Sequence, residues 1–452
     1  MAVMEMPLIE KLEMKHLKNS VMSISNPAAP VKNNYKAIFV IGVLFFVFGF
    51  VTWINSILIP YFKLTCNLST KQSMLVAFAF YISYFVMALP AAAILKRTGL
   101  KNGMMLGLFV MAVGALVFIP AAINRTYEIF LAGLFIQATG LTILQTASNP
   151  YITILGPIES AASRISIMGI CNKAAGAIAP LILINAITKN PEEIDLVQKQ
   201  LPTLSADGQA LLLNELSSRL IVPYIIMAIV LIGLGLMIRL AHLPDISQEE
   251  KPDADNGIKI VKNNILQFPH LILGAITIYC AVSVEVIAVD SIIGYAQYKG
   301  YNFSDAKFFA SYTLIFMILS YAVGVFAIPK IIRQRKALQL CGAAGFLLTL
   351  LAIFISGNTS VWCIAMLGLF NAMLWPNIWP LALDGLGKFT SRGSALLIMG
   401  IIGGALTPLI YGYFSDKSNH QLAYWVLLPC YLFILYYSTF GYKAGKQSLS
   451  EE

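Results

Sequence analysis

Three ionisable residues lie inside long apolar segments of the sequence, where a charge needs a partner. Lys173 falls near the middle of segment 162–188, and Glu285 falls near the middle of segment 268–297. Asp290 follows Glu285 by about a turn and a half of helix. A lone charge in the centre of a bilayer costs at least ~2.5–3.5 kcal/mol, so such residues face a partner, water or a mobile ion. We interpret all three as candidate ion-coupling residues, and a static ion pair between Glu285 and Lys173 is the alternative.

A second group of polar side chains in apolar segments consists of amides and tryptophans. Gln145 and Asn149 are four residues apart, as are Trp375 and Trp379, so each pair shares one helical face. Amides donate to and accept from hydroxyls, and aromatic rings stack on the apolar face of a pyranose. This combination favours a small neutral sugar over an ion or a lipid. The alternative, that each amide only joins neighbouring helices, stays open. The candidate sugar contacts are Asn55, Gln145, Asn149, Asn172, Trp375 and Asn377.

The composition excludes most classes of protein. Of the 452 residues 58% are hydrophobic and 12% are charged, about half the charged share of a soluble domain. The net charge of +9 comes mostly from short loops, which indicates membrane topology rather than a nucleic-acid partner. The six cysteines form no CxxC, and the four histidines lie near segment ends. We therefore expect no metal, no cofactor and no enzymatic activity.

Apolar runs of about 20 residues, the length that crosses a bilayer, occur twelve times. The sequence thus predicts an all-α membrane protein with twelve transmembrane helices in two pseudo-symmetric six-helix bundles. The predicted segments are 37–60, 73–95, 103–123, 127–155, 162–188, 219–242, 268–297, 307–329, 337–356, 360–384, 393–415 and 422–442.

Lysine and arginine in the short loops set the orientation. With the N-terminus inside, the inner loops carry ten of these residues and the outer loops carry six, which predicts cytoplasmic termini in a bacterial inner membrane. The loop 189–218 then lies outside, with a short helix in its QALLLNEL portion and no predicted chemistry. The predicted divisions are a tail 1–36, a half 37–242, a linker 243–267, a half 268–442 and a tail 443–452.

An internal repeat supports the two halves. Residues 140–182 align without a gap to residues 368–410, with 13 identities in 43 positions, where unrelated apolar helices share about 4. The repeat pairs segments six helices apart, so both copies have the same orientation in the membrane. Parallel six-helix repeats of this kind are typical of one large transporter superfamily. Arg164 and Arg392 become equivalent loop residues, which either cap helices and bridge the halves or only set topology.

Several stretches resemble the fucose–galactose–glucose proton symporters of the major facilitator superfamily. They include FFVFGFVTWINSILIPYFK, LQTASNPYITILGP, SRISIMGICNKAAGAIAPLIL and LFNAMLWPNIWPLALDGLGKFTS. The resemblance implies sugar contacts at Asn172 and Trp375. Ser56 and Gln145 stand where fucose members have acidic residues, and Gln145 resembles the glucose/galactose branch. Lys173 stands where small polar residues are more usual.

The resemblance implies a secondary active importer that carries a glucose- or galactose-like hexose with a proton by alternating access. Fucose, fructose or N-acetylhexosamine symport, sodium coupling, and multidrug export by the same fold are the alternatives. A sensor without transport is a further alternative, although neither tail is long enough for a signalling domain. We expect a monomer in the lipid bilayer.

Overall fold

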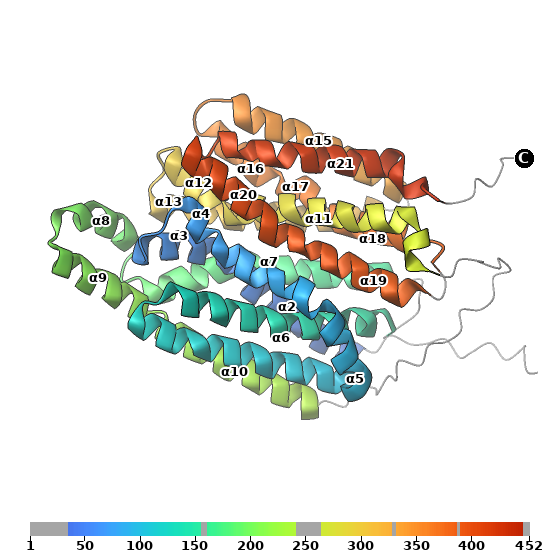
Figure 1. Cartoon of the computed structure of the whole chain (residues 1–452), viewed down its shortest axis with the longest axis horizontal. Coiled ribbons are helices and arrows are strands. Elements are labelled where there is room, and N and C mark those ends of the chain that lie inside the picture. The colour runs from blue at the N-terminus through green and yellow to red at the C-terminus, as the bar shows by residue number, and fades with distance from the viewer. Residues whose placement is uncertain (1–34, 155–160, 241–263, 328–330, 387–388, 446–452) are drawn as a thin grey trace, which may run out of the picture.

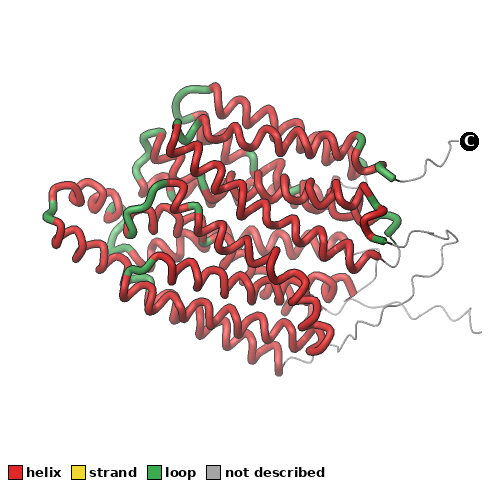
Figure 2. Tube along the Cα trace, viewed as in Figure 1, coloured by secondary structure: helices red, strands yellow, loops and turns green. Residues whose placement is uncertain are grey.

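The computed structural model describes residues 35–154, 161–240, 264–327, 331–386 and 389–445. Most of the two predicted tails and of the predicted linker lies outside these ranges. Within them the chain is helical, with no strand (Figure 2). The predicted all-α fold is therefore confirmed.

The first half of the chain runs up and down the bundle (Figure 1). Its helices are α2 (Tyr35–Trp53), α3 (Asn55–Thr65), α4 (Thr70–Ser73), α5 (Leu75–Asn124), α6 (Tyr127–Ile154), α7 (Ala161–Ile187), α8 (Glu193–Gln200), α9 (Ala206–Ser218) and α10 (Ile221–Leu240). Two short helices, α8 and α9, precede the last crossing helix of this half, α10.

The second half repeats this course with more interruptions. Its elements are α11 (Pro269–Asp290), α12 (Ile292–Tyr298), α13 (Phe303–Ala306), α14 (Phe308–Ala327), α15 (Gln334–Phe354), α16 (Thr359–Met366), α17 (Gly368–Asn371), α18 (Leu374–Leu383), α19 (Thr390–Met399), η5 (Gly400–Ile402), α20 (Gly403–Lys417), η6 (Leu422–Val426) and α21 (Leu427–Thr439).

Eleven segments of the described chain are long and apolar enough to cross a membrane. One of them, Thr70–Asn124, has 55 residues, about twice what a bilayer needs. It reverses at Gly99, whose φ of 75° is open to glycine but strained for other residues. Because this segment contains two passes, the chain makes the twelve predicted crossings. The first helical path extends to Thr65, five residues beyond its predicted end.

The loop 189–218 is more structured than its sequence suggests. The predicted short helix is present as α9, and a second helix, α8, precedes it. Ser217 on α9 donates to the carbonyl of Ala122 over 3.0 Å, and the hydroxyl of Tyr61 donates to the carbonyl of Leu216 over 2.7 Å. We call the end of the bundle that carries these helices the α8–α9 end (Figure 1), and the opposite end the linker end.

The two halves make their largest contacts in two regions. Helix α7 lies along α14, and α5 lies along α19 and α20. Ser311 on α14 donates its hydroxyl to the carbonyl of Ala177 on α7 over 2.6 Å. Small residues at such contacts let membrane helices approach closely. Asn172 and Lys173 lie on α7, one of these interface helices.

At the α8–α9 end, two carboxylates cross from one half to the other. Asp416 on α20 accepts from the backbone N–H groups of Thr70 and Lys71, over 2.9 and 2.7 Å. Asp195 on α8 accepts from the N–H groups of Phe303 and Ser304, over 2.7 and 3.1 Å. Thr70 begins α4 and Phe303 begins α13. In both cases an aspartate of one half accepts from N–H groups that have no partner within the helix of the other half. The halves are thus fastened to each other at this end.

Candidate functional site

Lys173 is held between three helices at the centre of the bundle. Its ammonium forms an ion pair with Glu285 on α11, which joins the two halves. The same ammonium lies 4.1 Å from the ring centroid of Trp53 on α2, a cation–π contact. Only 8% of the Lys173 side chain and 16% of the Glu285 side chain are exposed. The pairing that the sequence left open is therefore present.

Trp53 reaches this position because α2 and α7 approach closely. A Cβ atom at Gly176 would lie 2.3 Å from the indole, so a side chain there would displace the ring. The indole N–H donates to the side-chain oxygen of Asn172 over 3.1 Å. One hydrogen bond and one cation–π contact thus fix the indole against two successive residues, Asn172 and Lys173.

The other predicted sugar contacts lie on helices of both halves. On α6, Gln145 is half-buried and Asn149 is exposed. On α18, Trp375 stacks on Trp379 with ring centroids 5.1 Å apart and planes 25° from parallel. Asn377 is buried, and its amide donates to the carbonyl of Met373 on the preceding turn over 2.7 Å. The two tryptophans that share a helical face thus contact each other, and a sugar contact at Trp375 stays a prediction.

Two further amides serve helix packing instead. Gln137 is buried and its amide contacts the sulfur of Met227 over 3.2 Å, between α6 and α10. Asn371 donates to the carbonyl of Val284 over 3.1 Å and accepts from the hydroxyl of Tyr431 over 2.7 Å. Both amides bond to residues of their own half. Gln137 is eight residues from Gln145 on α6, but it faces Met227 on α10.

Asp290 and Asn55 are almost completely buried. Asp290 is 1% exposed, at the last position of α11. Asn55 is fully buried at the first position of α3. Within the described residues, no side-chain oxygen or nitrogen of either residue has a hydrogen-bond partner.

The repeat arginines differ in their environments. Arg164 is buried, and its Nε donates to the carbonyl of Ile152 in the last turn of α6 over 2.9 Å. This contact satisfies one of the carbonyls that a helix leaves unpaired at its C-terminus. Arg392 is exposed. The helix-capping role is therefore confirmed for Arg164.

Sequence reasoning missed Trp53, Tyr81 and the two aspartates of the α8–α9 end. Trp53 precedes Asn55 by two residues in a quoted motif, so an aromatic residue beside buried amides was a usable signal. Asp195 and Asp416 lie in polar segments near loop ends, where carboxylates are common and carry no distinguishing pattern. Their role depends on the folded arrangement of the two halves.

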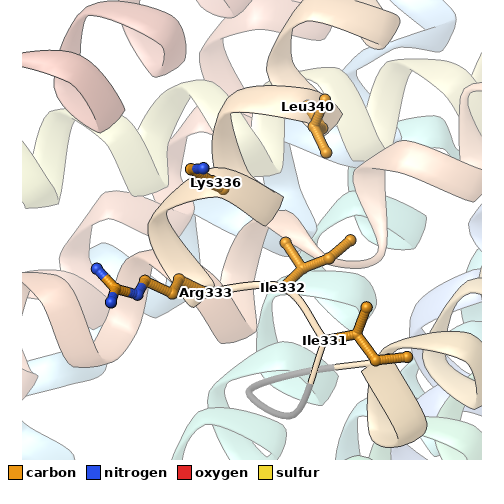
Figure 3. Close-up of a pocket in the computed structure, with 5 residues that line it drawn as sticks. All are labelled: Ile331, Ile332, Arg333, Lys336 and Leu340. Atoms are coloured by element: carbon orange, nitrogen blue, oxygen red, sulfur yellow. The ribbon is translucent and has the colours of Figure 1, made fainter.

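A cavity of about 620 Å³ opens at the start of α15, away from these residues. Figure 3 shows its lining side chains on the first turns of that helix and on the segment that leads into it. They are Ile331, Ile332, Arg333, Lys336 and Leu340. None of the predicted sugar or ion contacts lines it, so we place the candidate site at the central cluster.

The model of the Major Facilitator Superfamily matches residues 41–408. The chain belongs to the major facilitator superfamily. It is 33% identical over 420 residues to a glucose/galactose transporter of Brucella abortus, covering 91% of this chain and 96% of that protein. It is 28% identical over 404 residues to the L-fucose-proton symporter of Escherichia coli, covering 88% and 91%.

A solved structure of the E. coli fucose–proton symporter shares the fold. Its TM-score is 0.68 at 25% identity, over 89% of this chain and 98% of that one. The predicted membership of the superfamily and the resemblance to its fucose–galactose–glucose branch are confirmed. Members of this family are transporters and not enzymes, as predicted.

Proposed function

We propose that this protein is a secondary active importer that carries a hexose together with a proton by alternating access. The observation that carries the proposal is the buried Lys173–Glu285 pair, because it joins the two halves at the centre of the bundle. A charged contact placed there breaks or re-forms whenever the halves rock about a midplane site. Binding events at the centre therefore act directly on the equilibrium between the two arrangements.

The sugar site consists of amides and aromatic rings. Asn55, Gln145, Asn149, Asn172, Trp375 and Asn377 are the proposed contacts. The Trp375–Trp379 stack supports a pyranose as the substrate, since the sugar ring has an apolar face that can pack on an indole and hydroxyls at its edge that can bond to amides. Asn172 supports it further because Trp53 already orients its amide. The relatives named glucose/galactose transporters support glucose or galactose as the sugar.

The coupling groups are Glu285, Lys173 and Asp290. Two of them neutralise each other across the halves, and Asp290 lies five residues further along α11. A proton or a sugar that weakens the pair lowers the cost of separating α7 from α11. The relative named a fucose–proton symporter supports a proton as the coupling ion, and sodium is the alternative.

We assign the termini and the linker to the cytoplasm of a bacterial cell and the α8–α9 end to the outside. The moving units are residues 37–242 and 268–442, with 1–36, 243–267 and 443–452 on the cytoplasmic side. The excess of lysine and arginine in the loops at the linker end supports this orientation. The protein works as a monomer in the inner membrane, without cofactor or nucleic-acid partner.

Uptake into proteoliposomes tests the proposal. Radiolabelled glucose, galactose, fucose, fructose and N-acetylglucosamine are each offered with an imposed pH gradient, a sodium gradient or none. We expect accumulation of glucose or galactose driven by the pH gradient alone. Accumulation only with sodium would establish the other ion, and outward movement of drug-like cations without sugar uptake would establish an exporter.

A further inference from the structure

The chain interrupts its helical path at matching places in the two halves. Helix α2 gives way to α3 at Ile54, and α11 gives way to α12 at Ser291. Residues 55–58 read NSIL and residues 290–293 read DSII, so the two interruptions share a local sequence. Each lies within the first crossing of its half, after a helix of 19 residues in α2 and of 22 residues in α11. The backbone keeps helical angles at both places, with φ and ψ of −61° and −22° at Ile54 and of −95° and −16° at Ser291, so the chain turns locally without unwinding.

The serine of each interruption bonds back to the preceding helix. Ser56 donates to the carbonyl of Trp53 over 2.8 Å, and Ser291 donates to the carbonyl of Ile287 over 2.6 Å. Such hydroxyl-to-carbonyl bonds compete with the helical ladder and bend helices. The backbone ladder continues past each serine, since the N–H of Leu58 donates to the carbonyl of Ile54 and the N–H of Tyr295 donates to the carbonyl of Ser291. The hydroxyls of both serines are thus engaged, whereas the neighbouring Asn55 and Asp290 are left for another purpose.

Asn55 and Asp290 are buried without partners. Their exposed fractions are 0% and 1%, and within the described part of the chain none of their four side-chain polar atoms has a hydrogen bond. Helix α3 packs against both α11 and α12, which brings the two interruptions to one region of the interface. Burying an unpaired amide is unfavourable, and burying an isolated ionised carboxylate is far more so.

Tyr81 on α5 brings a third unpartnered group to this region. Its hydroxyl is buried and has no hydrogen-bond partner among the described residues. It interacts electrostatically with both Asp290 and Glu285. Its ring lies on Gly404 of α20, where a Cβ atom would come within 2.8 Å of the ring. Tyr81 therefore extends from the first half of the chain toward the carboxylates of the second.

The titratable groups around Asp290 include no cation that could balance its charge. Within the described chain Asp290 is in no salt bridge, and the only ammonium near the cluster, Lys173, is paired with Glu285. The other titratable groups are neutral phenols and one carboxylate. They include Tyr81 and Tyr84 on α5, Tyr295 on α12, Tyr411 on α20, Tyr424 on η6, and Glu285 on α11.

We infer that Asp290 is the group that holds the coupling proton while the α8–α9 end is closed, in a site completed by Asn55 and Tyr81. The inference rests on the proposed proton symport and names its loading group. One proton adds to one carboxylate oxygen, and no other bond changes. The neutral acid is the form that an apolar, water-poor site favours. Hard metal cations take six or more oxygen ligands, whereas a proton needs only the carboxylate.

The geometry also supplies the release step. Asp290 is the last residue of α11, and the chain continues from it through α12 and α13 to the α8–α9 end, where Asp195 and Asp416 join the halves. When these contacts open, water reaches the carboxylate, and its charged form is again solvated. Loading and release of the proton are thereby tied to the arrangement of the halves.

Sugar-induced proton uptake by the purified protein tests this inference. D-glucose and D-galactose are added to wild-type protein in weakly buffered detergent with a pH indicator, and their affinities are measured by calorimetry. We expect the sugar affinity of Asp290→Asn to stay within about threefold of the wild-type value. We expect its sugar-induced proton uptake to be at least tenfold smaller than that of wild type. The matched control Asp305→Asn removes an exposed carboxylate and should change neither quantity.

Two results would overturn the inference. Proton uptake by Asp290→Asn at the wild-type level would place the proton elsewhere, and a more than tenfold loss of sugar affinity would make Asp290 a sugar contact. If Asp290→Asn does not fold, Asp290→Glu should shift the pH midpoint of uptake, and an unshifted midpoint would contradict the assignment. Wild-type sugar binding without proton uptake would instead refute the proposed proton symport, and this inference with it.

Discussion

The indole N–H of Trp53 on α2 donates a hydrogen bond to the side-chain oxygen of Asn172 on α7, over 3.1 Å. The amide is therefore oriented before any ligand arrives, which lowers the entropy cost of binding. Asn172 lies beside the charged pair of Lys173 and Glu285. A ligand that contacts Asn172 thus sits next to the group that joins the two halves.

Removal of this amide should weaken sugar binding. We expect Asn172→Ala and Gln145→Ala each to raise the Kd for glucose or galactose roughly 5- to 150-fold, because a buried polar partner is left unpaired at about 1–3 kcal/mol. The matched control is Gln137→Leu, since Gln137 contacts Met227 away from the site. Calorimetric titration gives the three values. Wild-type affinity in both alanine variants would show that the sugar binds elsewhere.

The stacked tryptophans should act as an aromatic platform. We expect Trp375→Ala to weaken binding more than Trp375→Phe, because phenylalanine keeps a flat ring for the sugar while alanine removes it. Sugar should also change the tryptophan fluorescence of wild type, and this change should shrink in both variants. Equal affinity in Trp375→Ala and wild type would assign the residue to helix packing alone.

The ion pair should control coupling rather than sugar recognition. We expect Glu285→Gln to abolish uphill accumulation and to retain sugar counterflow, which needs no net ion movement. Removing one partner of a buried pair leaves the other charge uncompensated, at about 3–5 kcal/mol. Lys173→Met should therefore harm the wild type more than it harms Glu285→Gln. Accumulation by Glu285→Gln at the wild-type level would contradict this prediction.

The two cross-half aspartates should favour the arrangement closed at the α8–α9 end. Cysteines at Gln198 and Gln297, whose side chains approach to 3.4 Å across the halves, report closure through a short crosslinker. We expect Asp195→Asn to slow crosslinking about tenfold and Asp416→Asn about threefold. Asp195 is half-buried and Asp416 is exposed, so water screens the bonds of Asp416 more strongly.

The control for this experiment is Asp207→Asn, which removes an exposed carboxylate from α9. It should leave the crosslinking rate unchanged. Equal rates in all three variants and in the parent double-cysteine protein would show that the aspartates do not influence closure.

His420, between α20 and η6, should give stability a pH dependence. Burial, followed by the charge of Lys63, lowers its pKa to about 4, and Asp416 opposes this shift only in part. Below its ordinary pKa of about 6.5 the unfolded chain binds a proton that the folded protein does not. Stability should therefore be complete above pH 6.5 and fall by roughly 1–3 kcal/mol toward pH 4.

Thermal unfolding of detergent-solubilised protein between pH 4 and pH 7.5 measures this slope. His420→Gln should flatten it, because glutamine cannot take up the proton. The same slope in wild type and His420→Gln would assign the acid sensitivity to other groups.

The membrane-crossing pattern followed from the sequence because hydrocarbon imposes a length and a polarity on each helix. The predicted segments match the helices to within a few residues, and the repeat of 140–182 anticipated the paired halves. The interruptions at Ile54 and Ser291 were not predicted. Serine forms the same hydroxyl-to-carbonyl bonds inside uninterrupted helices, so its presence in a sequence does not mark a break.

Within the candidate site, the sequence identified residue types better than their partners. Lys173 and Glu285 were recognised because charge is rare in apolar segments, and their pairing needed the packing of α7 against the second half. Gln137 and Gln145 look alike in the sequence, yet the first bonds to Met227 and the second is half-buried on the same helix. Which neighbour an amide meets is decided by helix rotation, which periodicity determines only approximately.

The donors that hold the halves together at the α8–α9 end are main-chain N–H groups. Most side-chain substitutions leave these donors in place, so they test only the aspartates that accept from them. An alanine scan would register Asp195 and Asp416 and pass over their partners. Thr70 is the first residue of α4, a position where proline fits the helix and differs by lacking the N–H. Thr70→Pro would delete a donor to Asp416 without altering either carboxylate, but it would also remove the hydroxyl that accepts from Lys63 over 2.8 Å. Compared with Thr70→Val, which removes the same hydroxyl, it would expose a dependence that no survey of charged residues could detect.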